Sequence, residues 1–163
     1  MKTGLAAASA ALILTACAEQ DAARPESLAT ATASATEAVR TVYDGFAAGD
    51  MALATSRFAD DMEWREAEGH AYADGNPYTG AERIVGGVFA RFGQEWTGFA
   101  AVPDRFVEQD GHVVVLGRYR GTFTPTGRTL DAPFAHVWTV ESDRITSYTQ
   151  FTDTAAWNDT MDR

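Results

Sequence analysis

The C-terminal half of the chain contains four stretches in which apolar and polar residues alternate. The segments between them, Asp110-Gly111, Pro125-Thr126-Gly127 and Ser142-Asp143, have the composition of hairpin turns. Because each turn joins neighbouring stretches, the order of the strands along the chain is also their expected order in the sheet. The sequence therefore predicts four antiparallel strands, over residues 99–109, 112–123, 128–140 and 144–152.

Two short helices are expected to open the folded part of the chain. The spacing of Val39, Val42, Tyr43 and Phe46 places these residues on one face of a helix. A Gly-Asp pair at residues 49–50 ends this helix, and the apolar residues that follow predict a second helix.

A third helix is predicted from Thr79 to about Glu95, after a brief strand over residues 62–66 and a loop over residues 69–80. Long hairpins after three helices indicate an α+β fold in which the helices cover one face of the sheet. We therefore expect a curved antiparallel sheet wrapped around three N-terminal helices, which is a cone-shaped α+β barrel with a blind central pocket.

The first sixteen residues have the order of parts of a secretory signal peptide. Lys2 precedes an apolar run from Leu5 to Leu14, which is about half the length that a membrane-spanning helix needs. The run ends in Leu-Thr-Ala-Cys, which resembles the lipobox of bacterial lipoproteins, in which the cysteine sulfur is acylated. The alternative is an ordinary cleavage site, in which Cys17 is only a small residue. The sequence predicts a lipoprotein signal peptide over residues 1–16, with Cys17 as the lipidated residue.

Residues 17–34 are predicted to be the acylated cysteine and a flexible tether. The segment is rich in Ala, Thr, Ser and Glu, and Leu28 is its one large apolar residue, so it cannot bury a core. Ala18 differs from the aspartate that signals retention at the inner membrane. We expect an exported lipoprotein that faces the periplasm, with the outer membrane favoured, and that contacts the membrane through its lipid anchor only. The remaining residues, 35–163, have the size of one domain.

The charge of the chain is strongly acidic, with 23 Asp and Glu against 13 Lys and Arg, or −10. Loss of Lys2 with the signal peptide would leave 12 − 23, or −11. A chain of this charge is a poor partner for nucleic acid. Cys17 is the one cysteine, so no internal disulfide can form. His70 and His112 lie at expected turns without the spacing of metal ligands, and we predict neither a metal nor a cofactor.

Three motifs carry a family resemblance: Phe-Ala-Asp-Asp at residues 58–61, Thr-Gly at residues 79–80, and the segment from residue 131 to residue 136. They resemble motifs of the SnoaL-like and ketosteroid isomerase families of the nuclear transport factor 2-like superfamily. The resemblance covers the chain from about Thr36 to Met161 and implies a SnoaL-like domain over residues 35–163. It also implies a homodimer formed through the outer sheet face, with Phe134, Trp138 and Phe151 at the interface.

The same resemblance implies two catalytic residues. The proton-shuttling carboxylate of ketosteroid isomerases falls on Glu66. The tyrosine and aspartate that hold the enolate oxygen in those enzymes are not kept, although Tyr43 and His136 lie one residue from the corresponding positions. In SnoaL-type polyketide cyclases the catalytic histidine falls on His136 and the aspartate on Gln150. The implied catalytic residues are therefore Glu66 and His136.

The alternation of side chains along a strand predicts the surroundings of Glu66. Glu66 lies two residues after Trp64, so both side chains point to one face of the strand. Burial on that face would raise the pKa of the carboxyl group towards that of a useful general base. The alternatives are an exposed Glu66 paired with an arginine such as Arg65, and a core His136 bonded to a backbone carbonyl.

A pocket is expected between the helices and the sheet. Aromatic residues alternate along two neighbouring strands, and the family resemblance places them inside. Gly121, between two aromatic residues, would leave volume for a ligand. The alternative is ordinary core packing. The predicted pocket residues are Tyr43, Trp64, Tyr119, Phe123, Tyr148 and Gln150, an apolar lining with a few hydroxyl and amide groups that suits a small apolar or aromatic ligand.

Two functions follow from these residues. The first is a cofactor-free isomerase, cyclase or dehydratase that uses general acid–base chemistry on a carbonyl-bearing ligand, with Glu66 as the base and His136 as the acid or orienting group. The alternative is a non-catalytic periplasmic carrier or sensor. The enzyme hypothesis would fail if Glu66 and His136 lay on opposite faces of the sheet.

Overall fold

The computed structural model describes Met1 and residues 34–163. Cys17, the lipobox and the predicted tether up to residue 33 lie outside these described residues. Within residues 34–163, no helix is both long enough and apolar enough to cross a membrane.

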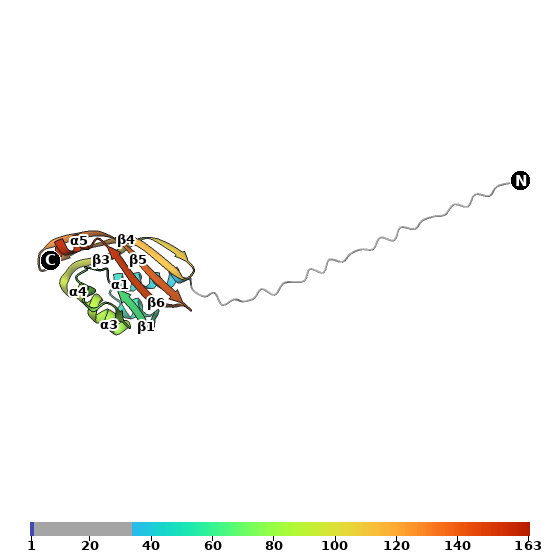
Figure 1. Cartoon of the computed structure of the whole chain (residues 1–163), viewed down its shortest axis with the longest axis horizontal. Helices are drawn as coiled ribbons and strands as arrows, with labels where there is room; N and C mark the ends of the chain where they lie inside the picture. Colours follow the sequence, from blue (N-terminus) through green and yellow to red (C-terminus); the bar gives the residue numbers. More distant parts are fainter. Residues whose placement is uncertain (2–33) are drawn as a thin grey trace. The chain divides into compact units, whose positions relative to one another are not determined.

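Six strands form one curved sheet that does not close on itself (Figure 1). Their order in the sheet is β2-β1-β6-β5-β4-β3. The α+β fold is confirmed, and the four long strands make the expected antiparallel meander. The strands are β1 (Phe58–Arg65), β2 (Tyr78–Thr79), β3 (Trp96–Gln109), β4 (His112–Phe123), β5 (Arg128–Glu141) and β6 (Arg144–Thr152).

The other edge of the sheet differs from the sequence-based expectation. Strand β1 begins four residues earlier than expected and runs parallel to β6, with Trp64 opposite Tyr148. Strand β2 pairs with β1 inside the segment predicted as a loop. A two-residue strand is too short to show an alternating pattern, which is why the sequence did not reveal it.

The curvature of the sheet is associated with irregularities in β3. The register between β3 and β4 shifts between Thr97 and Ala100 and again between Pro103 and Arg105. Gly98, within the first irregularity, has a φ of +63°, a left-handed conformation that glycine adopts readily. Such interruptions bend a strand, and the bent β3 contacts both α1 (Ala35–Ala48) and α4 (Ala90–Glu95).

The helices cover the concave side of the sheet (Figure 1). The side chain of Ser34 caps the N-terminus of α1, and Gly49 ends the helix in a left-handed conformation. The predicted third helix is present but changes type along its length. The remaining helical segments are α2 (Met51–Thr55), η1 (Ala73–Gly75), α3 (Ala81–Ile84), the π-helical turn η2 (Val85–Phe89) and α5 (Thr154–Met161).

Strand β5 shows which face of the sheet is interior. Its alternate residues, including Phe134, His136 and Trp138, are buried. Phe134 and Trp138 are only 4% and 1% exposed, so their assignment to an outer dimer interface is wrong. Phe151 of β6 has the opposite orientation and is 56% exposed. Alternation alone defined the two faces, but helix packing decided which face is inside.

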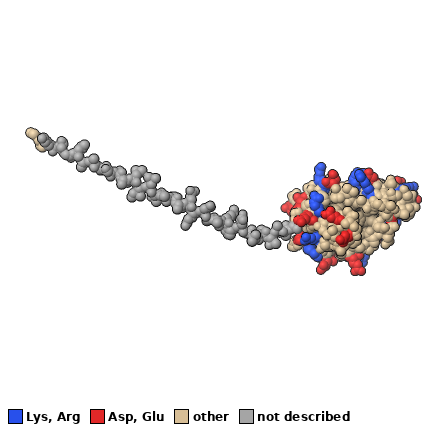
Figure 2. Space-filling view, turned by 180° about the vertical axis from the view of Figure 1, so that it is seen from behind, with Lys and Arg blue, Asp and Glu red and all other residues tan. Residues whose placement is uncertain are grey.

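Charged side chains of both signs are interspersed on the face of the domain that Figure 2 shows. Surface ion pairs include Arg118 with Asp131, at 2.6 Å, and Arg128 with Asp162, at 3.4 Å. Exposed pairs of this kind contribute little to stability. The apolar interior therefore dominates the energetics of the fold.

Candidate functional site

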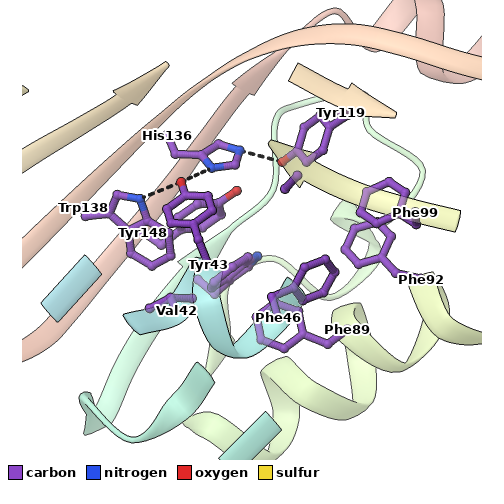
Figure 3. A pocket seen from close by; sticks show the side chains of 12 residues that line it. Val42, Tyr43, Phe46, Phe89, Phe92, Phe99, Tyr119, His136, Trp138 and Tyr148 are labelled. Carbon is purple, nitrogen blue, oxygen red and sulfur yellow. Dashed lines mark hydrogen bonds between the residues drawn. The ribbon is translucent and has the colours of Figure 1, made fainter. Parts of the chain in front are cut away.

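A small apolar cavity lies between α1, the helical segments η2 and α4, and the concave face of the sheet (Figure 3). Its volume is about 40 Å³, which exceeds the roughly 10–15 Å³ that one water molecule requires. A ligand of several rings would need to displace lining side chains. The lining consists of Val42, Tyr43, Phe46, Trp64, Phe89, Phe92, Phe99, Ala101, Tyr119, His136, Trp138 and Tyr148.

His136 joins two tyrosines at the wall of this cavity (Figure 3). Its Nδ1 lies 2.7 Å from the Tyr43 hydroxyl, and its Nε2 lies 2.5 Å from the Tyr119 hydroxyl. Trp138 Nε1 donates to the Tyr43 oxygen at 3.3 Å, and Gln150 Nε2 donates to the Tyr119 oxygen at 2.8 Å. His136 is therefore bonded to hydroxyl groups and not to a backbone carbonyl.

The protons of this Tyr–His–Tyr unit can be counted. Burial lowers the pKa of His136 well below its usual value, so the imidazole is neutral near pH 7. A neutral imidazole has one N–H and one acceptor nitrogen. One tyrosine must therefore donate to His136 while the other accepts from it. The accepting tyrosine, either Tyr43 or Tyr119, keeps its own O–H for another acceptor.

The cavity tyrosines remain protonated. Burial raises the pKa of Tyr43 and of Tyr119 above the usual value for a phenol, and it does the same for Tyr148. Neutral phenols donate hydrogen bonds. The cavity thus combines an apolar lining with hydroxyl donors at one wall.

Glu66 lies just beyond the end of β1 and is buried, with 1% of its side chain exposed. Its Oε1 accepts a hydrogen bond of 2.6 Å from Trp64 Nε1. The Asn76 side chain holds the Glu66 backbone, accepting from its N–H and donating to its C=O. Burial, offset in part by the Trp64 hydrogen bond, raises the pKa of Glu66 to about 7. The alternative of an exposed, arginine-paired Glu66 is wrong.

Glu66 and His136 lie on the same interior side of the sheet, but Glu66 does not line the central cavity. The indole of Trp64, stacked on Tyr148 at 3.7 Å, forms the wall there. Gln150 stands opposite His136 in the β5–β6 pairing and accepts from the backbone N–H of residue 67. Glu66 and Gln150 border a separate surface hollow of about 460 Å³.

The structure places the other expected pocket residues in different layers. Tyr43, Trp64, Tyr119 and Tyr148 line the cavity, whereas Gln150 lies behind Tyr119. Phe123 is buried against Trp96, at 5.0 Å between ring centroids, and does not line the cavity.

The expected free volume at Gly121 is filled. A Cβ atom on Gly121 would meet the Cα of Phe99 at 3.1 Å. The glycine therefore allows the close approach of a neighbouring strand, and Phe99 takes the space that was expected for a ligand.

His70 is the residue that sequence reasoning missed. Its side chain has no solvent exposure, and its Nδ1 lies 3.3 Å from Glu66 Oε2. The chain between them is a turn, in which the His70 N–H donates to the carbonyl of residue 67. The four-residue spacing from Glu66 was the available signal, but it indicates proximity only on a helix.

The fold, with its apolar cavity, is that of a nuclear transport factor 2-like domain. Residues 39–148 match the model of the SnoaL-like domain, and the chain belongs to this family. Comparison with curated proteins found no match.

Solved structures share this fold over most of the chain. A nuclear transport factor 2-like protein from Burkholderia thailandensis is 33% identical, with a TM-score of 0.74, and the match covers 78% of this chain and 96% of that one. TerC, co-crystallised with polyporic acid, is 28% identical, with a TM-score of 0.71 and coverage of 79% and 98%. IdmH from Streptomyces antibioticus, a candidate polyketide cyclase, shares the fold alone at 18% identity, with a TM-score of 0.67 and coverage of 79% and 99%.

Proposed function

We propose that the domain binds a small, apolar, carbonyl-bearing molecule in the central cavity and acts on it as a cofactor-free isomerase, cyclase or dehydratase. The observation that carries this proposal is the Tyr43–His136–Tyr119 unit at the cavity wall (Figure 3). The aromatic lining suits an apolar ligand body, and the phenolic O–H that His136 leaves free is a donor for a carbonyl oxygen.

Such a donor favours proton transfer at the carbon next to the carbonyl. Negative charge develops on the carbonyl oxygen when that carbon loses a proton, and a fixed donor in a low-dielectric site stabilises this charge. Glu66, with a pKa of about 7, is present in both protonation states near neutral pH and suits the exchange of that proton. Since Trp64 and Gln150 lie between its carboxyl group and the cavity, this role requires those side chains to shift on ligand binding.

One structural relative supports the class of ligand. TerC was crystallised with polyporic acid, whereas IdmH, at 18% identity, supports the fold alone. TerC therefore supports a small organic acid or related molecule as a ligand for the fold.

A matched pair of probes tests the proposal. Acetophenone and ethylbenzene have similar shapes, but only acetophenone has a carbonyl group. We expect tighter binding of acetophenone and a shift of its carbonyl stretch to lower infrared frequency. In D₂O, the protein should also accelerate deuterium exchange at the acetophenone methyl group, measured by NMR. Equal binding of the two probes would contradict the proposed carbonyl site.

The second candidate function is a carrier or sensor without chemistry. The specific observation in its favour is the position of Glu66, which is enclosed by Trp64 and His70 and does not line the cavity. A carrier would bind acetophenone and shift its carbonyl stretch, but it would not accelerate deuterium exchange. The same experiment therefore separates the two candidates.

We also propose that the chain is exported and held at the periplasmic face of a membrane, with the outer membrane favoured, through acylated Cys17. The lipobox-like sequence and the short apolar run before it support this placement. Two or three acyl chains would give a stable anchor, whereas one would not.

A homodimer remains a proposal, with a revised interface. The exposed apolar residues Val102, Leu116 and Phe151 are available on the domain surface, whereas Phe134 and Trp138 are not. Light scattering on the chain without residues 1–17 would test it. A strict monomer at high concentration would contradict it.

A further inference from the structure

A second group of titratable side chains lies beside the cavity, where the chain turns after β1. Glu66 and His70 face each other there, and neither side chain reaches solvent. The contact is 3.3 Å between Glu66 Oε2 and His70 Nδ1, and Glu66 Oε2 and His70 Nε2 have no hydrogen-bond partner in the part of the chain that the structure describes. Buried polar atoms are rarely left in this state.

The hydrogen-bond pattern fixes the tautomer of His70. The backbone N–H of Tyr72 donates to His70 Nδ1 at 3.2 Å, so this nitrogen presents a lone pair. The ring proton of a neutral His70 is then on Nε2. Glu66 Oε2 lies 3.3 Å from the same nitrogen. An ionised carboxylate would place two acceptors against each other, whereas a protonated Oε2 would donate to Nδ1 and share its one lone pair with the Tyr72 N–H.

We propose that His70 is a positioning residue for Glu66, and that its Nδ1 accepts the proton carried by Glu66 Oε2. The Glu66–His70 pair then holds one exchangeable proton, on the carboxyl group. His70 does not contact the cavity and acts through Glu66 alone. The catalytic meaning of the pair rests on the proposed function, whereas the position of the proton does not.

The surroundings hold the His70 ring in place. The Trp157 ring of α5 lies edge-on to it, with centroids 4.4 Å apart, and the Tyr72 ring lies at 5.4 Å. Asn158 of α5 donates to the carbonyl oxygen of Gly69 at 3.3 Å. The turn that carries His70 is thus packed against the last helix of the domain.

The electrostatic environment favours two neutral groups. The charged groups that act on the pair are Arg91, Asp74 and Arg163, and the nearby hydroxyls are those of Tyr119 and Tyr148. Burial raises the pKa of Glu66 to about 7 and lowers that of His70 to about 4. Between these values the carboxyl group keeps its proton and the imidazole gains none.

This arrangement adds to the expected role of Glu66. The sequence predicted a general base, which must start the reaction without its proton. With a pKa of about 7, part of Glu66 is ionised near neutral pH and takes the proton from the carbon next to the carbonyl. The protonated Oε2 then donates to His70 Nδ1, and this contact keeps the carboxyl proton in position until Glu66 returns it to the substrate.

Nitrogen NMR of the full chain, labelled at histidine, tests the pair directly. We expect the His70 signals of the tautomer with the proton on Nε2, and a change in the Nδ1 shift near pH 7 as Glu66 ionises. Glu66→Gln should remove that change, because its amide N–H₂ can donate to Nδ1 at every pH. A proton on His70 Nδ1 between about pH 4 and pH 7, or an unchanged titration in Glu66→Gln, would overturn the proposal.

Two substitutions at His70 provide a second measurement, the pKa of Glu66 from its carboxyl carbon shift. His70→Leu removes the acceptor of the acid proton, so the pKa of Glu66 should fall. His70→Asn can place Oδ1 near the position of Nδ1 and should restore a value closer to wild type. An unchanged pKa in His70→Leu would contradict the proposal. If neither variant folds, the tautomer of wild-type His70 decides.

Failure of the proposed function would give a different result. Absence of acetophenone exchange together with the expected His70 tautomer and titration would remove the enzymatic role and leave the Glu66–His70 pair established. Acetophenone exchange together with a proton on His70 Nδ1 would support the enzymatic role and remove the Glu66–His70 pair.

Discussion

His136 and His70 are both buried and both kept neutral, yet their surroundings give them different properties. Both nitrogens of His136 are bonded to phenols, whose protons are held tightly because burial raises the pKa of Tyr43 and Tyr119. His70 faces a carboxyl group whose pKa is about 7, and its Nε2 has no partner in the described structure. The neighbour, and not the histidine itself, decides whether a proton can move.

The two histidines also differ in how they are supported. His136 lies in the middle of β5, between β4 and β6, where strand pairing on both sides fixes its position. His70 lies in a turn that is held by Asn158 and Trp157. The hydroxyl groups bonded to His136 are therefore positioned by the sheet, whereas the Glu66–His70 pair is positioned by a turn. The following substitutions test this difference.

The largest expected effect is that of Glu66→Gln on acetophenone exchange. Loss of the proton-exchanging group should lower the protein-catalysed rate by about 100-fold to 10,000-fold, the usual contribution of general acid–base catalysis. The dissociation constant should change much less, since shape and hydrogen-bonding atoms are kept. Glu63→Gln, at an exposed position of β1 three residues before Glu66, is the matched control. Equal loss in both variants would remove the special role of Glu66.

The next effect concerns the pH dependence of stability. Because the pKa of Glu66 is raised from 4.5 to about 7, the folded protein binds more protons than the unfolded chain in this range, and stability falls as pH rises through it. The free energy of unfolding of Glu66→Gln, relative to wild type, should therefore rise by roughly 3 kcal/mol between pH 4.5 and 7. Urea unfolding at several pH values measures this difference.

His70→Asn should show the opposite sign. The pKa of His70 is lowered from 6.5 to about 4, so its contribution to stability grows as pH rises across that range. The free energy of unfolding of His70→Asn, relative to wild type, should fall over the same interval. If the free energies of unfolding of both variants, relative to wild type, changed with pH in the same direction, the opposite pKa shifts of Glu66 and His70 would be contradicted.

Removal of a tyrosine hydroxyl at the cavity wall should lower the free energy of unfolding at every pH. Tyr119→Phe removes the hydrogen-bond partner of His136 Nε2 and that of Gln150 Nε2, at a cost of about 1–3 kcal/mol for each unsatisfied group. Tyr43→Phe should cost less, because the Trp138 bond that it also removes is long, at 3.3 Å. Chemical unfolding gives both values. A larger loss in Tyr43→Phe would contradict this ranking.

Cys17→Ser should leave both histidine sites unchanged. A serine hydroxyl cannot form the thioether that holds a diacylglycerol, so incorporation of a labelled fatty acid should be abolished. Acetophenone binding by the variant should match that of wild type. Incorporation that persists in the variant would contradict the lipoprotein assignment.

Much of the sheet could be predicted from the sequence because its signals are local. Asp110-Gly111 and Ser142-Asp143 mark turns, and both pairs adopt the positive φ angles that such turns require. Asp153 caps α5 through its side chain, as a residue of its type does before a helix. Each of these signals acts within a few residues.

Less of the candidate site could be predicted from the sequence. Alternation placed Glu66 and Trp64 on one face of their strand. It also placed Phe134, His136 and Trp138 together on one face of a second strand. It did not show that Phe134 and Trp138 face inward, nor that Phe99 fills the space above Gly121. These outcomes depend on which elements pack together.

The sequence by itself determined the α+β class, the hairpin order and the resemblance that led to Glu66 and His136, because periodicity and turn chemistry act over short distances along the chain. The tertiary structure alone decided which polar groups meet. The parallel pairing of β1 with β6 brings Trp64 against Tyr148, and the turn after β1 brings His70 to Glu66. The raised pKa of Glu66 has the same origin, since it follows from the removal of water by residues distant in the chain.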